Sequence, residues 1–304
     1  MDSDPSLQPL VSGGAIVRNR LDKWFPYLVV GPIFLHFTLF YLGPFLTNVI
    51  MSFMDWKVVG DSTFVGLANW GRLFRDPIFW QSLKNTVVFS LYYVVPVIAL
   101  GLGLAMIVNS GLRGAPLFQA IYFLPVVTSF VVIAGIWVWI FSPEPFGLVN
   151  QILAFFGLKP QMFLASRQQA LGVLAGLSIF KVAGTAMVYY YGGLKDIPLE
   201  LYEAGKIDGA DGLKTFRYIT WPLLKPTTLF VLIFITVGSF QVFDSIYLLT
   251  GGGPSNATTT IVHQMYLHGF VFFNLGYAGT ISIVLMLIIL VLSMVQNVLV
   301  KYDY

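Results

Sequence analysis

The chain has 304 residues, of which 57% are hydrophobic and 10% are charged, and its mean hydropathy is +0.79. Soluble domains use roughly 45–50% apolar residues, so this composition predicts an integral membrane protein. The formal net charge of +3 is too small to indicate a nucleic-acid partner, and the absence of cysteine excludes disulfides, thiolate catalysis and cysteine-ligated metals.

Six apolar runs are long enough to cross a bilayer as helices, since a hydrocarbon core about 30 Å thick requires roughly 20 residues. In chain order these runs are Tyr27–Phe53, Asn85–Asn109, Leu117–Phe141, Ala170–Gly193, Thr227–Leu249 and Leu275–Leu299. Each is continuously apolar, and together they contain only two charged residues, Lys181 and Asp244. The sequence therefore predicts an all-α membrane protein with six transmembrane helices in residues 27–299.

The segments between the runs predict which side of the membrane each one faces. Residues 1–26 form a polar leader with no small-residue cleavage site, so we expect a tail rather than a signal peptide. Six spans place both termini on one side, and with the termini inside, the cytoplasmic segments hold ten Lys and Arg residues against six outside. This asymmetry predicts a cytoplasmic N-terminal tail, a cytoplasmic loop at 194–226 and a short cytoplasmic C-terminus at 300–304.

The loop at 194–226 holds ten of the 31 charged residues of the chain. Pro198 suits the first turn of a short helix, and Asp196 just before it is a candidate cap. Gly209 can take a positive φ and end that helix, and Asp211 can cap a second helix, which we expect to end before Pro222. The loop is therefore predicted to form a helix, a turn and a second helix.

Both predicted short helices carry apolar side chains on one face. Leu199 and Tyr202 share a face of the first helix, and Leu213, Phe216 and Ile219 share a face of the second. So small a unit cannot bury both of its sides by itself. We therefore expect it to pack on the ends of its own spans and to dock a partner protein on the other side.

The stretch "YEAGKIDGADGLKTFRYITWPLLKP" at 202–226 carries a known motif. Its matching residues are Glu203, Ala204, Asp208, Gly209, Ala210, Phe216, Ile219, Pro222 and Pro226. It resembles the EAA loop of ABC importer permeases, which in that family is a coupling helix seated in a cleft of a separate ATPase subunit. Gly205 in place of the second Ala and Trp221 in place of the usual Leu are departures, and neither removes the turn. The resemblance implies an ATPase-coupling site made by the residues Glu203, Ala204, Asp208, Gly209, Ala210, Phe216 and Pro222.

Other stretches extend this resemblance over nearly the whole chain. The segments "FVGLANW", "FLPVVTSFVVIAGIWVWIF" and "TGGGPSNATTT" look like those of carbohydrate-type permeases related to the maltose and glycerol-phosphate importers. The resemblance implies a type I importer permease fold in a bacterial cytoplasmic membrane. It also implies a second homologous permease, two ATPase subunits, an extracytoplasmic solute-binding protein and a sugar-like solute as partners.

No cofactor, metal or enzymatic activity is expected in this chain. The phosphate-binding pattern G-x-x-x-x-G-K-[ST] does not occur, so ATP and Mg are expected to bind to the partner ATPase subunits. His263 and His268 are five residues apart, which is not the i, i+4 spacing of two metal ligands on one helix face.

Two polar stripes within the spans are candidate parts of a solute pathway, because polar side chains in a bilayer face protein or water rather than lipid. Each stripe recurs at three- and four-residue steps, which places it on one helix face. The residues are Ser178, Lys181, Thr185 and Tyr189 in the fourth span and Gln241, Asp244 and Tyr247 in the fifth. Lys181 and Asp244 either contact solute or form a structural ion pair with each other.

The polar groups of these stripes favour a neutral sugar or oligosaccharide as the solute, since carboxylate, amide, hydroxyl and aromatic groups suit sugar hydroxyls and sugar faces. Glycerol phosphate or a related phosphodiester is the alternative, because a lysine suits a phosphate group. A secondary transporter driven by an ion gradient is the alternative from another class, and it predicts several intramembrane acids. A membrane enzyme is the weakest alternative, because no cluster of nucleophile, base and orienting group is visible.

Overall fold

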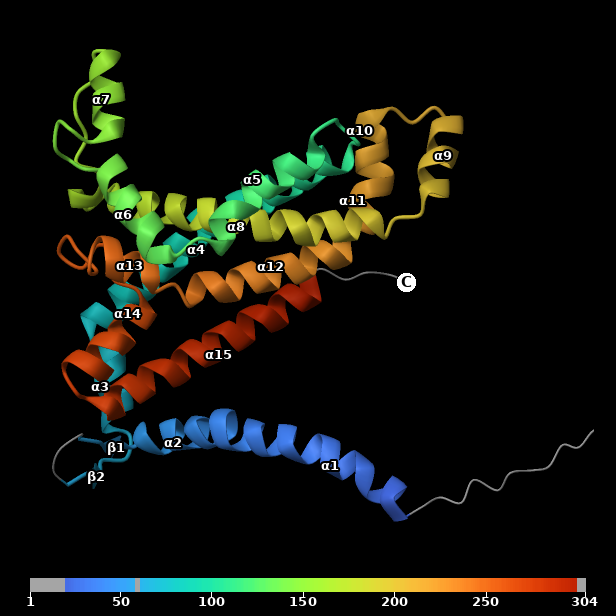
Figure 1. The fold of residues 1–304 in the computed structure, drawn as a ribbon. Helices are drawn as coiled ribbons and strands as arrows, with labels where there is room; N and C mark the ends of the chain where they lie inside the picture. Colours follow the sequence, from blue (N-terminus) through green and yellow to red (C-terminus); the bar gives the residue numbers. More distant parts are fainter. Residues whose placement is uncertain (1–19, 58–60, 300–304) are drawn as a thin grey trace, which may run out of the picture. The chain divides into compact units, whose positions relative to one another are not determined.

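A computed structural model describes residues 20–57 and 61–299 (Figure 1). Most of the predicted N-terminal tail and the whole predicted C-terminus at 300–304 lie outside the described residues. The chain divides into two compact units, Met1–Asn48 and Val49–Tyr304, and each is described here by itself.

The described part of the first unit is helical. It contains α1 (Arg20–Phe37), a π-helical turn η1 (Thr38–Leu42) and the start of α2 (Gly43–Met51), which continues into the second unit. The helix begins at Arg20, ahead of the predicted start of the first span. The π turn is marked by the N–H of Gly43, which bonds to the carbonyl of Thr38 five residues earlier.

The second unit is helical apart from a two-stranded hairpin, β1 (Met54–Asp55) and β2 (Thr63–Phe64), which pair antiparallel. Its first half contains α3 (Ala68–Arg75), α4 (Pro77–Asn109), α5 (Ala115–Val127), α6 (Phe130–Ile140), α7 (Leu148–Phe155), η2 (Phe163–Ala165) and α8 (Ala170–Lys195). Its second half contains α9 (Leu199–Ile207), α10 (Gly212–Thr215), η3 (Phe216–Thr220), α11 (Trp221–Leu223), α12 (Lys225–Phe240), α13 (Asp244–Leu249), α14 (Ile261–Tyr266), η4 (Leu267–Val271) and α15 (Leu275–Leu299).

Four of the helices are long and apolar enough to cross a membrane as single spans, namely Trp24–Met51, Pro77–Asn109, Ala170–Lys195 and Leu275–Leu299. Two further spans result if each of two bent helix pairs counts as one. The pair Ala115–Val127 and Phe130–Ile140 bends by 96°, and the pair Gly212–Leu223 and Lys225–Phe240 bends by 66°. The sequence thus located six apolar segments correctly.

The prediction of continuous third and fifth spans was wrong. The third breaks at Thr128 and Ser129, whose ψ angles of 144° and 133° are extended, and Pro125 has already removed one helical N–H three residues earlier. The fifth ends at Phe240, and the helix starting at Asp244 is a separate element.

The core of the second unit lies where α4 and α8 pack along each other, with α12 beside them. Phe89, Val97, Leu174, Met187 and Tyr190 are almost fully buried there. A smaller cluster joins α3, α4, α14 and α15. Figure 1 shows α9, α10 and α11 at one end of this helical body and α3, α7, α13 and α14 at the opposite end.

Candidate functional site

The charged segment at 199–223, called the loop element below, has the predicted helix and turn at its start. Gly209 has a φ of 76°, in the left-handed region, and the side chain of Asp211 accepts a hydrogen bond from the N–H of Lys214 at 3.0 Å. Both local predictions are confirmed. The cap predicted for Asp196 was wrong, because α9 has no side-chain cap and Pro198 is its N-cap residue, with a ψ of 136°.

The sequence predicted that the second helix of the loop element ends before Pro222, and this prediction was wrong. The chain runs from α10 through the π turn η3 into α11, which includes this proline. The N–H of Trp221 bonds to the carbonyl of Phe216 five residues earlier, so the helix widens just before the residue that lacks an N–H. The element therefore leads into α12 through a bend rather than through a loop.

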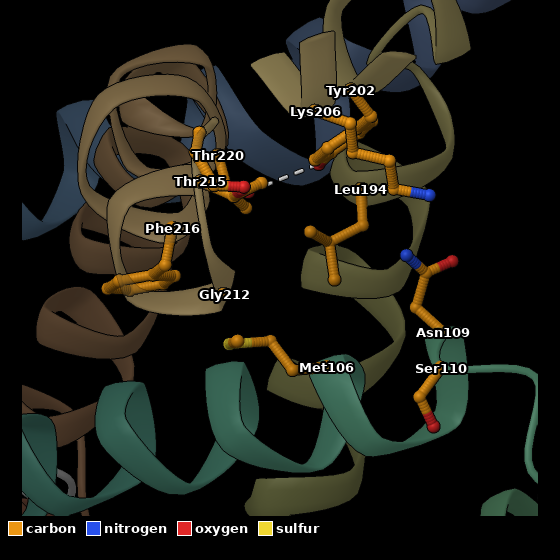
Figure 2. A pocket seen from close by; sticks show the side chains of 11 residues that line it. Met106, Asn109, Ser110, Leu194, Tyr202, Lys206, Gly212, Thr215, Phe216 and Thr220 are labelled. Atoms are coloured by element: carbon orange, nitrogen blue, oxygen red, sulfur yellow. Dashed lines mark hydrogen bonds between the residues drawn. The ribbon is translucent and has the colours of Figure 1, made fainter. Parts of the chain in front are cut away.

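The loop element has two arms, α9 and the continuous segment from α10 to α11, and their inner sides contact each other. Gly205 is buried, and a Cβ there would meet the Cδ1 atom of Ile219 at 2.6 Å. The hydroxyl groups of Tyr202 and Thr220 lie 3.2 Å apart (Figure 2). Glycine at position 205, where the motif has its second alanine, thus lets the first arm approach the second.

A cavity of about 360 Å³ separates the loop element from the ends of α4 and α8 (Figure 2). Met106 and Asn109 of α4, Leu194 of α8, and Lys206 and Phe216 of the loop element line it. The inner side of the element thus packs loosely on its own spans.

The outer side of the loop element is apolar and charged at once. Ile207, Leu213 and Tyr218 are 88%, 77% and 71% exposed. The motif residues Glu203, Ala204, Asp208, Gly209 and Pro222 are exposed, and Ala210 and Phe216 are partly buried. Within the described part of the chain no salt bridge uses an acid of this element, since the ion pair found there joins Lys57 and Asp55. Unpaired charges around large exposed apolar side chains form a surface suited to a protein partner.

Lys181 does not form an ion pair with Asp244. Its Nζ atom donates hydrogen bonds to the carbonyls of Pro125, Val126 and Thr128 at 3.0, 3.2 and 2.7 Å, where α5 ends. An ammonium group has three N–H bonds, so all three are used. Gly184, one turn further along α8, lets its backbone lie against the carbonyl of Tyr122. Lys181 therefore satisfies the carbonyl groups that the break in the third span leaves without helical partners.

The residues Gln241, Asp244 and Tyr247 are exposed in this chain and lie at the break that follows α12. Four aromatic rings gather where α13 starts: Phe243, Tyr247 and Tyr266 are mutually adjacent, with centroids 5.2, 5.2 and 5.0 Å apart, and Phe270 lies 5.7 Å from Tyr266. We call these four rings the aromatic ladder. A carboxylate beside a row of ring faces can bind a polyol through its hydroxyl groups and its apolar face.

The two predicted stripes are not brought together as one site. Tyr189 packs edge-on against Phe230 and Phe234 of α12, and Thr185 is partly buried on the same helix. Of the predicted stripe residues, Ser178 does reach the other helix, since its hydroxyl oxygen lies 3.5 Å from that of Ser245.

Sequence reasoning also missed Tyr266 and Phe270, which complete the aromatic ladder. Their four-residue spacing after the glycine-rich segment was the signal available.

The glycine-rich segment at 250–264 is packed by its own side chains. Thr258, Thr259 and Thr260 are fully buried. Thr259 accepts a hydrogen bond from the side-chain amide of Gln264 at 2.9 Å and lies 3.0 Å from Nδ1 of His263. Burial lowers the pKa of His263, so this imidazole is neutral at pH 7.

Comparison with known proteins identifies relatives of this architecture. Residues 97–302 match the family described as "Binding-protein-dependent transport system inner membrane component". The chain is 35% identical to the arabinooligosaccharides transport system permease protein AraP of Bacillus subtilis (strain 168), over 89% of this chain and 87% of that protein. It is 35% identical to the sn-glycerol-3-phosphate transport system permease protein UgpA of Agrobacterium fabrum (strain C58), over 90% and 94%. Among solved structures, a chain of a bacterial ABC transporter involved in the import of the acidic polysaccharide alginate aligns with a TM-score of 0.81 and 25% identity, over 92% of this chain and 96% of that one.

Proposed function

The chain belongs to the family of binding-protein-dependent transport system inner membrane components, the permease subunits of ABC importers, and from this premise we propose that it forms half of a pathway importing a sugar or oligosaccharide. The other half is a second homologous permease. Two ATPase subunits bind ATP and Mg and supply the energy, and an extracytoplasmic binding protein delivers the solute. This chain holds no cofactor and catalyses no reaction itself.

The loop element is the observation that carries this proposal. It presents exposed Ile207 and Leu213 among unpaired charges, while Gly209 and Asp211 fix the angle between its two arms. A rigid apolar projection of this kind suits a cleft in a soluble protein. This geometry, together with the family, supports an ATPase-coupling role for Glu203, Asp208 and their neighbours.

A neutral sugar is favoured over a phosphate ester by the surroundings of Lys181. All three N–H bonds of its ammonium group are already donated to carbonyls, so this lysine is not available to a phosphate group. Asp244 and the aromatic ladder offer acceptor and stacking groups instead. The solute pathway proposed here uses Gln241, Asp244 and Tyr247, with Thr185 and Tyr189 deeper along α8.

Two measurements on the purified complex test the function. The chain is extracted in mild detergent, and the proteins that co-purify are identified. The complex is then reconstituted, and ATP hydrolysis and uptake are measured with neutral oligosaccharides and with glycerol 3-phosphate. We expect two ATPase subunits, a second permease and sugar-dependent stimulation. Uptake coupled to an ion gradient without an ATPase would contradict the proposal.

Orientation is tested in intact cells with single cysteines in this cysteine-free chain. With both termini and the loop element in the cytoplasm of a bacterial cell, Thr215→Cys is protected from an impermeant thiol reagent and Ser255→Cys is labelled. Labelling at position 215 from outside would reverse the topology.

A further inference from the structure

A pocket of about 590 Å³ lies at the end of the helical body opposite the loop element. Arg72 and Arg75 come from the last turn of α3, and Gln264 and His268 come from the connection between α13 and α15. The pocket is therefore bordered by the connecting segments between helices, and two guanidinium groups lie on one side of it.

Arg72 is held in place by a short chain of contacts. Its guanidinium group lies over the ring of Tyr277, 4.2 Å from the centroid. The hydroxyl of Tyr277 donates a hydrogen bond to Oδ2 of Asp76 at 2.7 Å, and Oδ1 of Asp76 accepts from the N–H of Ile78 at 2.8 Å. Asp76 therefore has both oxygens occupied, and the stacked guanidinium keeps its N–H edge free.

Asp76 also lines the pocket, but its two oxygens accept hydrogen bonds from Ile78 and Tyr277, and it forms no ion pair with either arginine. Across residues 20–57 and 61–299 neither Arg72 nor Arg75 makes an ion pair, and neither side chain donates a hydrogen bond. Burial and the nearby Arg72 lower the pKa of His268, so at pH 7 its imidazole is neutral and adds no charge. The two guanidinium groups thus line a cavity in which the acidic residue, Asp76, is hydrogen-bonded to other groups, and the pocket keeps a net positive charge.

We propose that Arg72 and Arg75 receive an acidic side chain of the extracytoplasmic binding protein when that protein docks. The inference rests on the proposed function, which places this end of the molecule outside the cytoplasm. Arginine suits this task because its planar fork binds a carboxylate through two parallel hydrogen bonds. Complementary charge at such a position steers docking and fixes its register.

The position of the pocket favours a protein carboxylate over a lipid phosphate or an anionic solute. The pocket is bordered by α3, Asn256 of the glycine-rich segment and the α14 region, which are connecting segments at the end that the proposed topology places outside the cytoplasm. The proposed solute contacts are Asp244 and the aromatic ladder, and neither arginine is among them.

The test uses the complete importer in phosphatidylcholine nanodiscs, titrated with the solute-loaded binding protein that co-purifies with it. The readout is the binding-protein concentration that gives half-maximal ATP hydrolysis. Arg75→Gln should raise it by about tenfold, which corresponds to ~1.4 kcal/mol. Arg75→Lys should give a smaller increase, because the charge remains and the fork is lost. The maximal rate should not change, and added salt should weaken the wild type more than Arg75→Gln.

Lys84→Gln is the matched control, because Lys84 is an exposed cation on α4 outside the pocket. Arg72→Gln is the second variant, and its thermal stability shows whether the stack on Tyr277 matters for folding. An unchanged half-saturating concentration in both arginine variants would overturn the proposal. A change in the half-saturating concentration that appears only when the nanodiscs contain phosphatidylglycerol would also overturn it. So would variants in which solute stimulates ATP hydrolysis less while the half-saturating concentration of binding protein stays normal. A wild type that ignores the binding protein would overturn the proposed function itself.

Discussion

The loop element and the glycine-rich segment lie at opposite ends of the helical body and satisfy their groups in opposite ways. In the glycine-rich segment, buried threonines and Gln264 bond to one another and to the backbone. In the loop element, Ile207 and Leu213 project outward and the acidic residues have no ion-pair partner in the described chain. The glycine-rich segment satisfies its own polar groups, whereas the loop element leaves apolar side chains and charges for the partner proposed above.

This contrast shows where the chain depends on other proteins. A segment that satisfies its own polar groups keeps its shape when it is alone. Large apolar side chains that are exposed in the isolated chain become buried only when a partner covers them.

Replacing both Ile207 and Leu213 by Asp should have the largest effect. Truncating a well-packed interface anchor removes about 2–4 kcal/mol of binding free energy, and a charge adds desolvation. We expect ATPase subunits to stop co-purifying and uptake to be lost, while the chain still inserts. Phe155→Asp on α7 is the control, since Phe155 is 85% exposed at the other end. Retention of the ATPase by the double variant would show that the loop element is not the interface.

Lys181→Met should destabilise the body between the two ends. It leaves three carbonyls without a donor, and each unsatisfied buried group costs about 1–3 kcal/mol. We expect a lower melting temperature and weak uptake, with partial recovery in Lys181→Arg. Asp244→Asn should keep wild-type stability, and adding it to Lys181→Met should not restore the loss. A recovery in that double variant would mean that the two charges are paired after all.

Gly209→Val should uncouple the loop element without unfolding it. A β-branched residue at a φ of 76° is strained by roughly 1–2 kcal/mol, and the two arms would realign to relieve it. Solute-stimulated ATP hydrolysis should fall. Gly209→Asn is the matched control, because asparagine tolerates the left-handed region. Equal activity in both variants would remove the turn from the coupling mechanism.

Acidification should give the smallest effect, and only at the glycine-rich end. Because burial lowers the pKa of His263, the folded segment disfavours the protonated ring. The neutral ring stabilises the fold fully above pH 6.5, the ordinary pKa of histidine. This stabilisation is lost as the pH falls from 6.5 through the lowered pKa of the folded state. Amide exchange, corrected for intrinsic rate, should accelerate at 250–264. The loop element contains no histidine, so equal acceleration there would point to a general loss of structure.

Local features were the ones that the sequence predicted well. The apolar runs located the four single-helix spans and overlap both bent pairs, and Asp211 and Gly209 behave as expected because a cap and a turn depend on a few neighbouring residues. The break in the third span was not predicted, because the lysine that stabilises it lies on α8. Local rules also predicted an end before Pro222, which the π turn η3 avoids.

The candidate site was predicted only in part for the same reason. Tyr247 was identified from its spacing, but Tyr266 reaches it from another helix. Arg72 and Arg75 entered the sequence analysis only as positive charges on one side. That they share a cavity depends on how α3 packs beside α14 and α15, which hydropathy does not encode.

The hydrogen bonds of Lys181 have a consequence for how the protein is made. The third span is synthesised first, yet the donor for the Thr128 carbonyl follows 53 residues later. Until α8 emerges from the ribosome and enters the bilayer, the broken end of α5 needs water or the insertion machinery to bind its carbonyls. We therefore expect the third span to stay in contact with water or the insertion machinery until the fourth arrives, and the two to enter the lipid as a pair.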